Sequence, residues 1–342
     1  MSSEPTLMHQ EVREIPTAVE RLLSSGGRAI ETAAKAAREA DPRFFISVAR
    51  GSSDHAATYL KYASELLLRR PMASVGPSVN SIYGVTLDAA GAVGISVSQS
   101  GQSPDIVRLT EALRSSGART IAITNNESSR LAAAADATLP IHAGPEISVA
   151  ATKTFVTSLV AGLWFIAEMK GDADLIRAIH ALPADLERAT ACDWSAAAAS
   201  MDGRSLFTLG RGPSSAISNE AALKFKETCL IHAESYSSAE VLHGPVSIVE
   251  SGFPVIAFAA RDKAEKSTAE TADALASKGA RVFAVTDRVS QATPLPHVRT
   301  GHWLCDPIPA IVSFYAMVEQ VAVGRGIDPD RPRHLNKVTE TV

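Results

Sequence analysis

The stretch Gly94–Thr110, G-I-S-V-S-Q-S-G-Q-S-P-D-I-V-R-L-T, decides the fold of this chain. The apolar run Ala92–Val97 overlaps its start and predicts a buried parallel strand. Pro104 suits the first position of a helix. Apolar residues follow it at helical spacing: Ile106, Val107, Leu109 and Leu113. Strands alternate with helices in this way along the chain, which predicts an α/β fold with parallel sheets.

The turn between this strand and this helix, Ser98–Ser103, is rich in hydroxyl groups and carries no positive charge. Backbone N–H groups, serine hydroxyls and a helix N-terminus can together bind one small anion, such as a phosphate. The same turn can also be an ordinary connection whose serines only cap the helix, with Ser103 as the N-cap. The turn alone leaves both interpretations open.

The composition is that of a soluble α/β protein with a sizeable core. Of the 342 residues, 46% are hydrophobic and 20% are charged. This length predicts about two domains. A net charge of −4 and a pI near 6.2 give no basis for binding nucleic acid or an anionic membrane. We therefore expect neither as a partner.

Cysteine usage and the terminal sequence predict a cytoplasmic protein. The three cysteines are too far apart for a disulfide framework or a C-x-x-C site: Cys192, Cys229 and Cys305. The N-terminus is polar and acidic, unlike a signal peptide. The longest apolar stretch, Phe155–Ala167, is too short to span a bilayer and predicts a buried helix.

The chain order predicts two α/β domains with helical segments around them. The expected regions are a helical lead-in (1–40), a first α/β domain (41–170), a helical connector (171–201), a second α/β domain (202–328) and a C-terminal tail (329–342). We expect each domain to be a doubly wound parallel sheet flanked by helices.

An internal repeat supports this division. Arg211-Gly212 follows Arg50-Gly51 at an offset of 161 residues, and Lys278–Asp287 repeats Ser116–Asn125 at an offset of 162. Two matches at nearly the same offset indicate duplicated α/β units.

The two halves carry different chemistry. At the offset of 162, Ser98 corresponds to Ala260, so the hydroxyl-rich turn occurs only in the first half. The helix after the Arg211 turn carries ionisable residues instead, and their first-half counterparts cannot ionise usefully. These residues are Glu220, Lys224 and Glu227, against approximately Tyr59, Ala63 and Leu66. The division predicts one composite site formed by both halves.

Glu220, Lys224 and Glu227 are spaced i, i+4 and i+7, which places them within about 60° of one helix face. Mostly apolar neighbours predict partial burial, which would shift the pKa values of the three groups towards proton-transfer work. The alternative is a solvated ladder of salt bridges. The spacing is consistent with both.

Other motifs are less specific. His243 precedes the turn Gly244-Pro245, a loop position that suits an exposed acid or base better than a core histidine. The sequence Gly210–Ser215 lacks the third glycine of a dinucleotide fingerprint, and there is neither a Walker A lysine loop nor an H-E-x-x-H pair. We therefore expect no cofactor and no metal.

A series of motifs in fixed order covers nearly the whole chain. They are Met8–Pro16, Arg50–Ser53, Ser98–Ser103, Glu146–Lys153, Gly210–Gly212, Glu220–Glu227, Ile231–Glu234, Glu240–Pro245 and Pro332–Lys337. Together they resemble the sugar isomerase (SIS) family. More narrowly, they resemble the isomerase half of glucosamine-6-phosphate synthase and the SIS-type glucosamine-6-phosphate deaminases. The resemblance implies two tandem SIS domains.

The resemblance also implies substrate-binding residues. The sugar phosphate would be held by Ser98, Gln99, Ser100 and Ser103. The sugar would be contacted by Ser52, Ser53 and the loop from Val149 to Ala151. Two of these motifs depart from the synthase, which typically has cysteine in place of Arg50 and often serine in place of Ala151.

The catalytic roles that the resemblance implies fall on five residues. Glu227 would move a proton between C1 and C2 of the sugar, supported by Lys224 and Glu220. His243 would assist ring opening and, as in the family, would be donated across a homodimer interface. Lys337 would reach the carbonyl end of the open-chain sugar, either as a charge or as a Schiff base.

The implied activity is an isomerising deaminase that converts glucosamine 6-phosphate and water to fructose 6-phosphate and ammonia. The alternatives are a fructosamine-6-phosphate deglycase, a galactosamine-6-phosphate deaminase or an ammonia-dependent glucosamine-6-phosphate synthase. A non-catalytic sugar-phosphate sensor is a further alternative, although the five catalytic positions are all retained. Only about forty residues precede the first expected strand. We therefore expect no glutaminase domain.

Overall fold

The computed structural model describes residues 5–335 and Lys337. The chain folds into two compact units. The first contains Thr17–Glu146, Lys153–His180 and Lys337, and the second contains residues 5–16, Ile147–Thr152 and Ala181–Leu335. The expected helical lead-in therefore divides, because its first helix belongs to the second unit.

The first unit is built on a parallel five-stranded sheet of order β2-β1-β3-β4-β5. Its strands are β1 (Phe44–Val48), β2 (Met72–Ser74), β3 (Ala92–Val97), β4 (Arg119–Thr124) and β5 (Ala137–Pro140). The strand predicted over Ala92–Val97 is confirmed, and all six of its residues are buried. The strand order reverses direction between β1 and β3, as in other doubly wound sheets.

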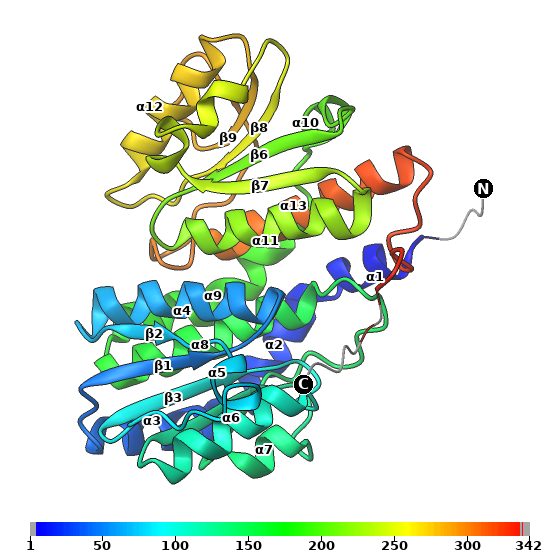
Figure 1. Cartoon of the computed structure of the whole chain (residues 1–342). Helices are drawn as coiled ribbons and strands as arrows, with labels where there is room; N and C mark the ends of the chain where they lie inside the picture. Colours follow the sequence, from blue (N-terminus) through cyan, green and yellow to red (C-terminus); the bar gives the residue numbers. More distant parts are fainter. Residues whose placement is uncertain (1–4, 336, 338–342) are drawn as a thin grey trace. The chain divides into compact units, whose positions relative to one another are not determined.

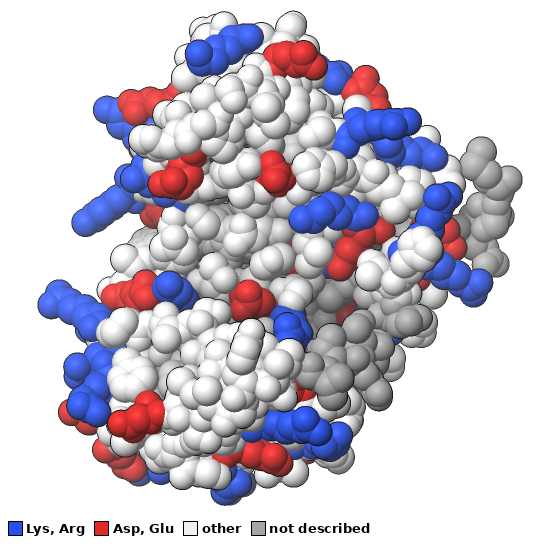
Figure 2. All heavy atoms as spheres, viewed as in Figure 1, with Lys and Arg blue, Asp and Glu red and all other residues white. Residues whose placement is uncertain are grey.

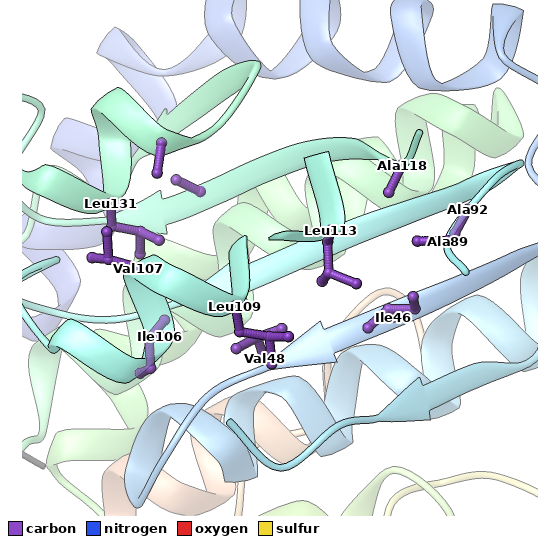
Figure 3. Packing of buried hydrophobic residues seen from close by; sticks show 12 residues of the cluster. Ile46, Val48, Ala89, Ala92, Ile106, Val107, Leu109, Leu113, Ala118 and Leu131 are labelled. Carbon is purple, nitrogen blue, oxygen red and sulfur yellow. The ribbon is translucent and has the colours of Figure 1, made fainter. Parts of the chain in front are cut away.

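Helices cover both faces of this sheet. They are α2 (Ile15–Ser25), α3 (Gly27–Glu39), α4 (Ser52–Leu67), α5 (Ser78–Ser81), α6 (Pro104–Ser115), α7 (Arg130–Ala134), α8 (Lys153–Lys170) and the start of α9 (Ala173–Thr190). In α6 the apolar residues at helical spacing point at the sheet, where Leu109 packs near Val48 of β1 (Figure 3). The predicted buried helix over Phe155–Ala167 is confirmed as α8, which packs against α3 and α4.

The second unit repeats this architecture. Its parallel sheet has the order β10-β9-β8-β6-β7, which is the order of the first sheet read from the other edge. The strands are β6 (Ser205–Gly210), β7 (His232–Ser237), β8 (Pro254–Phe258), β9 (Arg281–Val285) and β10 (Thr293–Pro294). The duplication predicted from the sequence offsets is therefore confirmed.

The helices of the second unit follow the same plan. They are α1 (Leu7–Arg13), the end of α9, α10 (Ser195–Ser200), α11 (Ser214–Cys229), α12 (Glu265–Ala276), α13 (Pro307–Gly324) and two 3-10 turns, η1 (Glu240–Leu242) and η2 (Pro245–Ile248). Figure 1 shows α11 and α13 on one face of this sheet and α12 on the other. These helices correspond to α4, α8 and α6 of the first unit.

Within the described residues, α13 is the one helix that is long and apolar enough to cross a membrane. However, 78% of it is buried inside the structure. Its Phe314 packs edge-on against Phe225 of α11, with 5.2 Å between ring centroids, and also contacts Phe258 of β8. These contacts are those of a core helix. On the face shown in Figure 2, acidic and basic side chains are interspersed.

Candidate active site

The hydroxyl-rich turn lies where a doubly wound sheet usually binds its ligand. Strands β1 and β3 are paired, with Val48 opposite Ser96, and the strand order reverses between them. Ligands of such sheets bind outside the carboxyl ends of the strands at this reversal. The segments after β1 and after β3 both start there, so Ser52 and Ser53 belong to the same edge of the sheet as Ser98–Ser103.

The turn after β3 is held in one shape by its own groups. The Ser98 hydroxyl accepts the Gly101 N–H at 3.2 Å, and the Ser100 hydroxyl accepts the Gln102 N–H at 3.3 Å. Gly101 has φ +63°, and a Cβ there would lie 2.2 Å from the Ser129 hydroxyl. Only glycine therefore fits this position.

Ser103 occupies the N-cap position of α6 but does not act as a cap. Its backbone is extended, with φ −61° and ψ 115°, and its side chain makes no capping hydrogen bond. The interpretation that the serines only cap the helix is therefore wrong for Ser103. Its hydroxyl is half-buried. At the start of α6, Pro104 has no N–H, and the N–H groups of Ile106 and Val107 donate to Asp105 Oδ1 and to the Ser103 carbonyl.

Ser52 and Ser53 form the first turn of α4. Gly51 precedes them with φ +56° and ψ −134°, a conformation that favours glycine. Asp54 follows them, and its burial raises the pKa of this carboxyl group against the opposing charges of His55 and Arg50.

The second unit carries the ionisable helix. On α11, the Lys224 Nζ lies 3.1 Å from Glu220 Oε1 and donates to Glu227 Oε2 at 2.6 Å. The side chains of Glu220 and Lys224 are fully buried, whereas that of Glu227 is 20% exposed. The predicted burial is confirmed, and the solvated salt-bridge ladder is excluded for this triad.

Lys224 remains charged despite its burial. Desolvation would lower the pKa of Lys224, but the neighbouring Glu220 and Glu227 carboxylates outweigh it and raise this pKa well above its ordinary value. The Tyr315 hydroxyl of α13 donates to Glu220 Oε1 at 3.0 Å. Lys224 is therefore a fixed ammonium, and Glu227 is the triad member that a substrate can reach.

The segment that contains Val149 and Ala151 belongs to the second unit and is anchored by helix α1. The carboxylate of Glu11 accepts the backbone N–H of Ile147 and, at 3.3 Å, that of Ser148. Glu11 is itself 5% exposed. Val149 and Ala151 are half-buried directly after this anchor.

Lys337 belongs to the first unit, where it pairs with a buried carboxylate. Its Nζ donates to Glu146 Oε2 at 2.8 Å, and Glu146 also accepts the N–H and the hydroxyl of Thr154 at the start of α8. Burial alone would raise the pKa of Glu146, but the Lys337 charge and these hydrogen bonds hold it below its ordinary value. The ionised Glu146 therefore holds Lys337 in place.

His243 lies on the loop after β7, between η1 and η2, and is exposed as predicted. No contact between His243 and the triad occurs among the interactions that the structure describes. In that same part of the chain, no group of three histidine, cysteine or acidic residues is arranged to hold a metal ion.

The partners of the candidate residues could not be identified from sequence spacing. Glu11, Glu146 and Tyr315 each contact a candidate residue or its loop from a distant part of the sequence. Glu11 and Glu146 lie inside motifs of the family resemblance, which was the only sequence signal for them. Tyr315 lies in an apolar helix with no such signal.

A comparison with protein-family models identifies the SIS domain twice in this chain, over residues 40–168 and 201–325. The glutamine–fructose-6-phosphate aminotransferase (isomerizing) of Pyrobaculum aerophilum is 33% identical over 97% of this chain and 57% of its own length. That of Zymomonas mobilis is 30% identical over 96% of this chain and 58% of its own length. The chain thus spans somewhat more than half the length of these curated relatives.

Solved structures show the same similarity. A Silicibacter pomeroyi protein, provisionally assigned as a phosphosugar isomerase, is 57% identical with a TM-score of 0.93, covering 95% of this chain and 100% of that one. The C-terminal domain of glucosamine-fructose-6-phosphate aminotransferase from Francisella tularensis is 25% identical with a TM-score of 0.83, covering 96% and 99%. Thermotoga maritima glucosamine-6-phosphate deaminase, at 21% identity, a TM-score of 0.79 and coverage of 98% and 100%, shares the fold.

Proposed function

Because this chain belongs to the SIS domain family, we propose that it is a sugar-phosphate isomerase, and specifically an isomerising glucosamine-6-phosphate deaminase. It would convert glucosamine 6-phosphate and water to fructose 6-phosphate and ammonia. The observation that carries the proposal is the buried triad on α11, with one carboxylate still open to a substrate.

The phosphate would bind at the turn after β3. Ser98, Ser100 and Ser103 would offer their hydroxyls to it. The backbone N–H groups of Gly101 and Gln102 already donate to the Ser98 and Ser100 hydroxyls and orient them. Gln99 lies in the same turn, and Ser52 and Ser53 at the same sheet edge would contact the sugar. Anchoring the phosphate fixes the rest of the sugar for proton transfer.

Glu227 would carry out the proton transfer. In the open-chain sugar, its carboxylate would take the proton from C2, which gives an enolamine, and would return it to C1. A second proton passes from the C2 amine to the C1 oxygen, so that the aldehyde becomes an alcohol and the amine becomes a C2 imine. General base catalysis of this kind contributes about 10²- to 10⁴-fold to a rate. Water then hydrolyses the imine to the ketone and releases ammonia.

The other residues would support this step. Lys224 keeps a positive charge beside Glu227, and Glu220 completes the charge balance with help from Tyr315. His243 would assist ring opening from a second copy of the chain. Lys337, which donates to Glu146, would act at the carbonyl end of the sugar.

A product assay tests the proposal. Purified protein is incubated with glucosamine 6-phosphate, and ammonia and fructose 6-phosphate are measured together. The proposal expects both products in equal amounts. Turnover of galactosamine 6-phosphate or a fructosamine 6-phosphate, but not of glucosamine 6-phosphate, would support the isomerase site and correct the proposed substrate.

Formation of glucosamine 6-phosphate from fructose 6-phosphate and ammonia, without the opposite reaction, would reverse the proposed direction of the reaction. Absence of turnover with all of these substrates would contradict the proposal that the protein is an enzyme acting on amino sugar phosphates.

A further inference from the structure

The phosphate turn contains no cation, but the fold places one beside it. In the pairing of β1 with β3, Val48 lies opposite Ser96. Arg50 follows Val48 by two residues, and Ser98 follows Ser96 by two residues. Because the two strands are parallel neighbours, Arg50 and Ser98 both follow their strands at the same end of the sheet.

An aspartate fixes the direction of this arginine. Arg50 Nε donates to Asp105 Oδ2 at 2.6 Å, and Asp105 is fully buried in the first turn of α6, directly after Ser103 and Pro104. A guanidinium has five N–H donors, and this bond uses one of them. The donors on the two Nη atoms take no part in this bond, and 45% of the arginine side chain is exposed.

We propose that Arg50 is a phosphate-binding residue, whose guanidinium supplies the positive charge that the turn Ser98–Ser103 lacks. This inference rests on the proposed function, because it concerns the same phosphate site. A guanidinium matches two phosphate oxygens at once, and such charge-assisted bonds are about twice as strong as neutral ones. Arg50 also offsets the carboxylates of Asp54 and Asp105, which would otherwise repel a dianion at this sheet edge.

The second half of the chain provides an internal comparison. Arg211 is the counterpart of Arg50, and Ser267 is the counterpart of Asp105 at the offset of 162. Among the residues that the structure describes, this arginine donates to the serine hydroxyl over a long distance, 3.4 Å from Nη1 to Oγ. The hydroxyl-rich turn is absent from that half. The ion pair of Arg50 with Asp105 thus occurs in the half that has the hydroxyl-rich turn. This favours a role of Arg50 in binding over a general role in stabilising the sheet.

Ligand binding to the full-length protein tests this role without relying on turnover. The dissociation constants of inorganic phosphate and fructose 6-phosphate are measured by calorimetry for the wild type and Arg50→Gln. Loss of a charge-assisted bond predicts an increase of about 10- to 100-fold. Arg50→Lys should recover part of the loss, because a point charge lacks the fork geometry.

Arg114→Gln is the matched control. Arg114 Nε contacts Asp136 Oδ1 at 2.7 Å, so it is the same kind of ion pair at the other end of α6. Its removal should leave both dissociation constants unchanged. The melting temperatures of the two variants then distinguish a loss of stability from a loss of ligand binding.

The charge of the ligand gives the decisive readout. At one fixed pH, the wild type should prefer fructose 6-phosphate, a dianion, over its monoanionic isostere fructose 6-sulfate. Arg50→Gln should lose most of that preference, whereas substitution of a merely structural arginine would leave the ratio of the two dissociation constants unchanged.

If that ratio or the phosphate affinity is unchanged in Arg50→Gln, the role of Arg50 is refuted and the proposed function is not affected. A wild type that binds neither phosphate ligand would overturn it together with the phosphate site. Arg50-dependent binding without deamination would leave the inference standing and refute the proposed reaction.

Discussion

Lys224 is the residue on which the charge balance of the candidate site depends, because it lies between two carboxylates and is fully buried. Replacing it by methionine would leave Glu220 and Glu227 without their cation. Removing one partner of a buried ion pair costs about 3–5 kcal/mol. We expect Lys224→Met to lower the free energy of unfolding by about this amount, as measured by urea denaturation at neutral pH.

Lys226 provides the control for this prediction, since it lies on the same helix but is exposed. Lys226→Met should change the free energy of unfolding by less than about 0.5 kcal/mol. Equal effects of the two substitutions would mean that the buried charges do not depend on each other.

At the scale of elements, the contact of Glu146 with Lys337 and Thr154 connects Lys337 to the start of α8. Because the folded structure holds the pKa of Glu146 below its ordinary value of 4.5, the contact stabilises the fold at every pH above that value. The stabilisation is lost as pH falls through the lower folded-state pKa.

Glu146→Gln tests this dependence. The difference in melting temperature between wild type and variant should be largest at neutral pH and should shrink as the pH is lowered below about 4.5. Glu270, an exposed glutamate of α12, is the control, and Glu270→Gln should show no such trend. A difference that stays constant down to pH 3 would contradict the ionised state assigned to Glu146.

Elements and their order could be predicted from the sequence, because strand and helix periodicity is local. The strand Ala92–Val97, the helix opened by Pro104 and the duplication were all predicted correctly. Side-chain partners could not be predicted in this way. The Arg50–Asp105 and Lys337–Glu146 contacts join segments far apart in sequence, and no spacing rule relates such positions.

At the scale of the whole molecule, the family resemblance predicts that two copies share their active sites, with His243 donated by the partner. Subunit mixing tests this prediction. Glu227→Gln and His243→Ala should each be nearly inactive alone. Mixed in equal amounts, they form heterodimers in which one site has both residues, so activity should return to about a quarter of wild type. A mixture as inactive as its components would mean that His243 acts within its own chain.

The turnover of Glu227→Gln measures whether Glu227 transfers the proton. With ammonia and fructose 6-phosphate as the readout from glucosamine 6-phosphate, we expect kcat to fall about 10²- to 10⁴-fold. Glu270→Gln should keep wild-type turnover, and fructose 6-phosphate should bind Glu227→Gln nearly as it binds the wild type. Near-normal turnover by Glu227→Gln would contradict the catalytic role of Glu227, because another group would then move the proton.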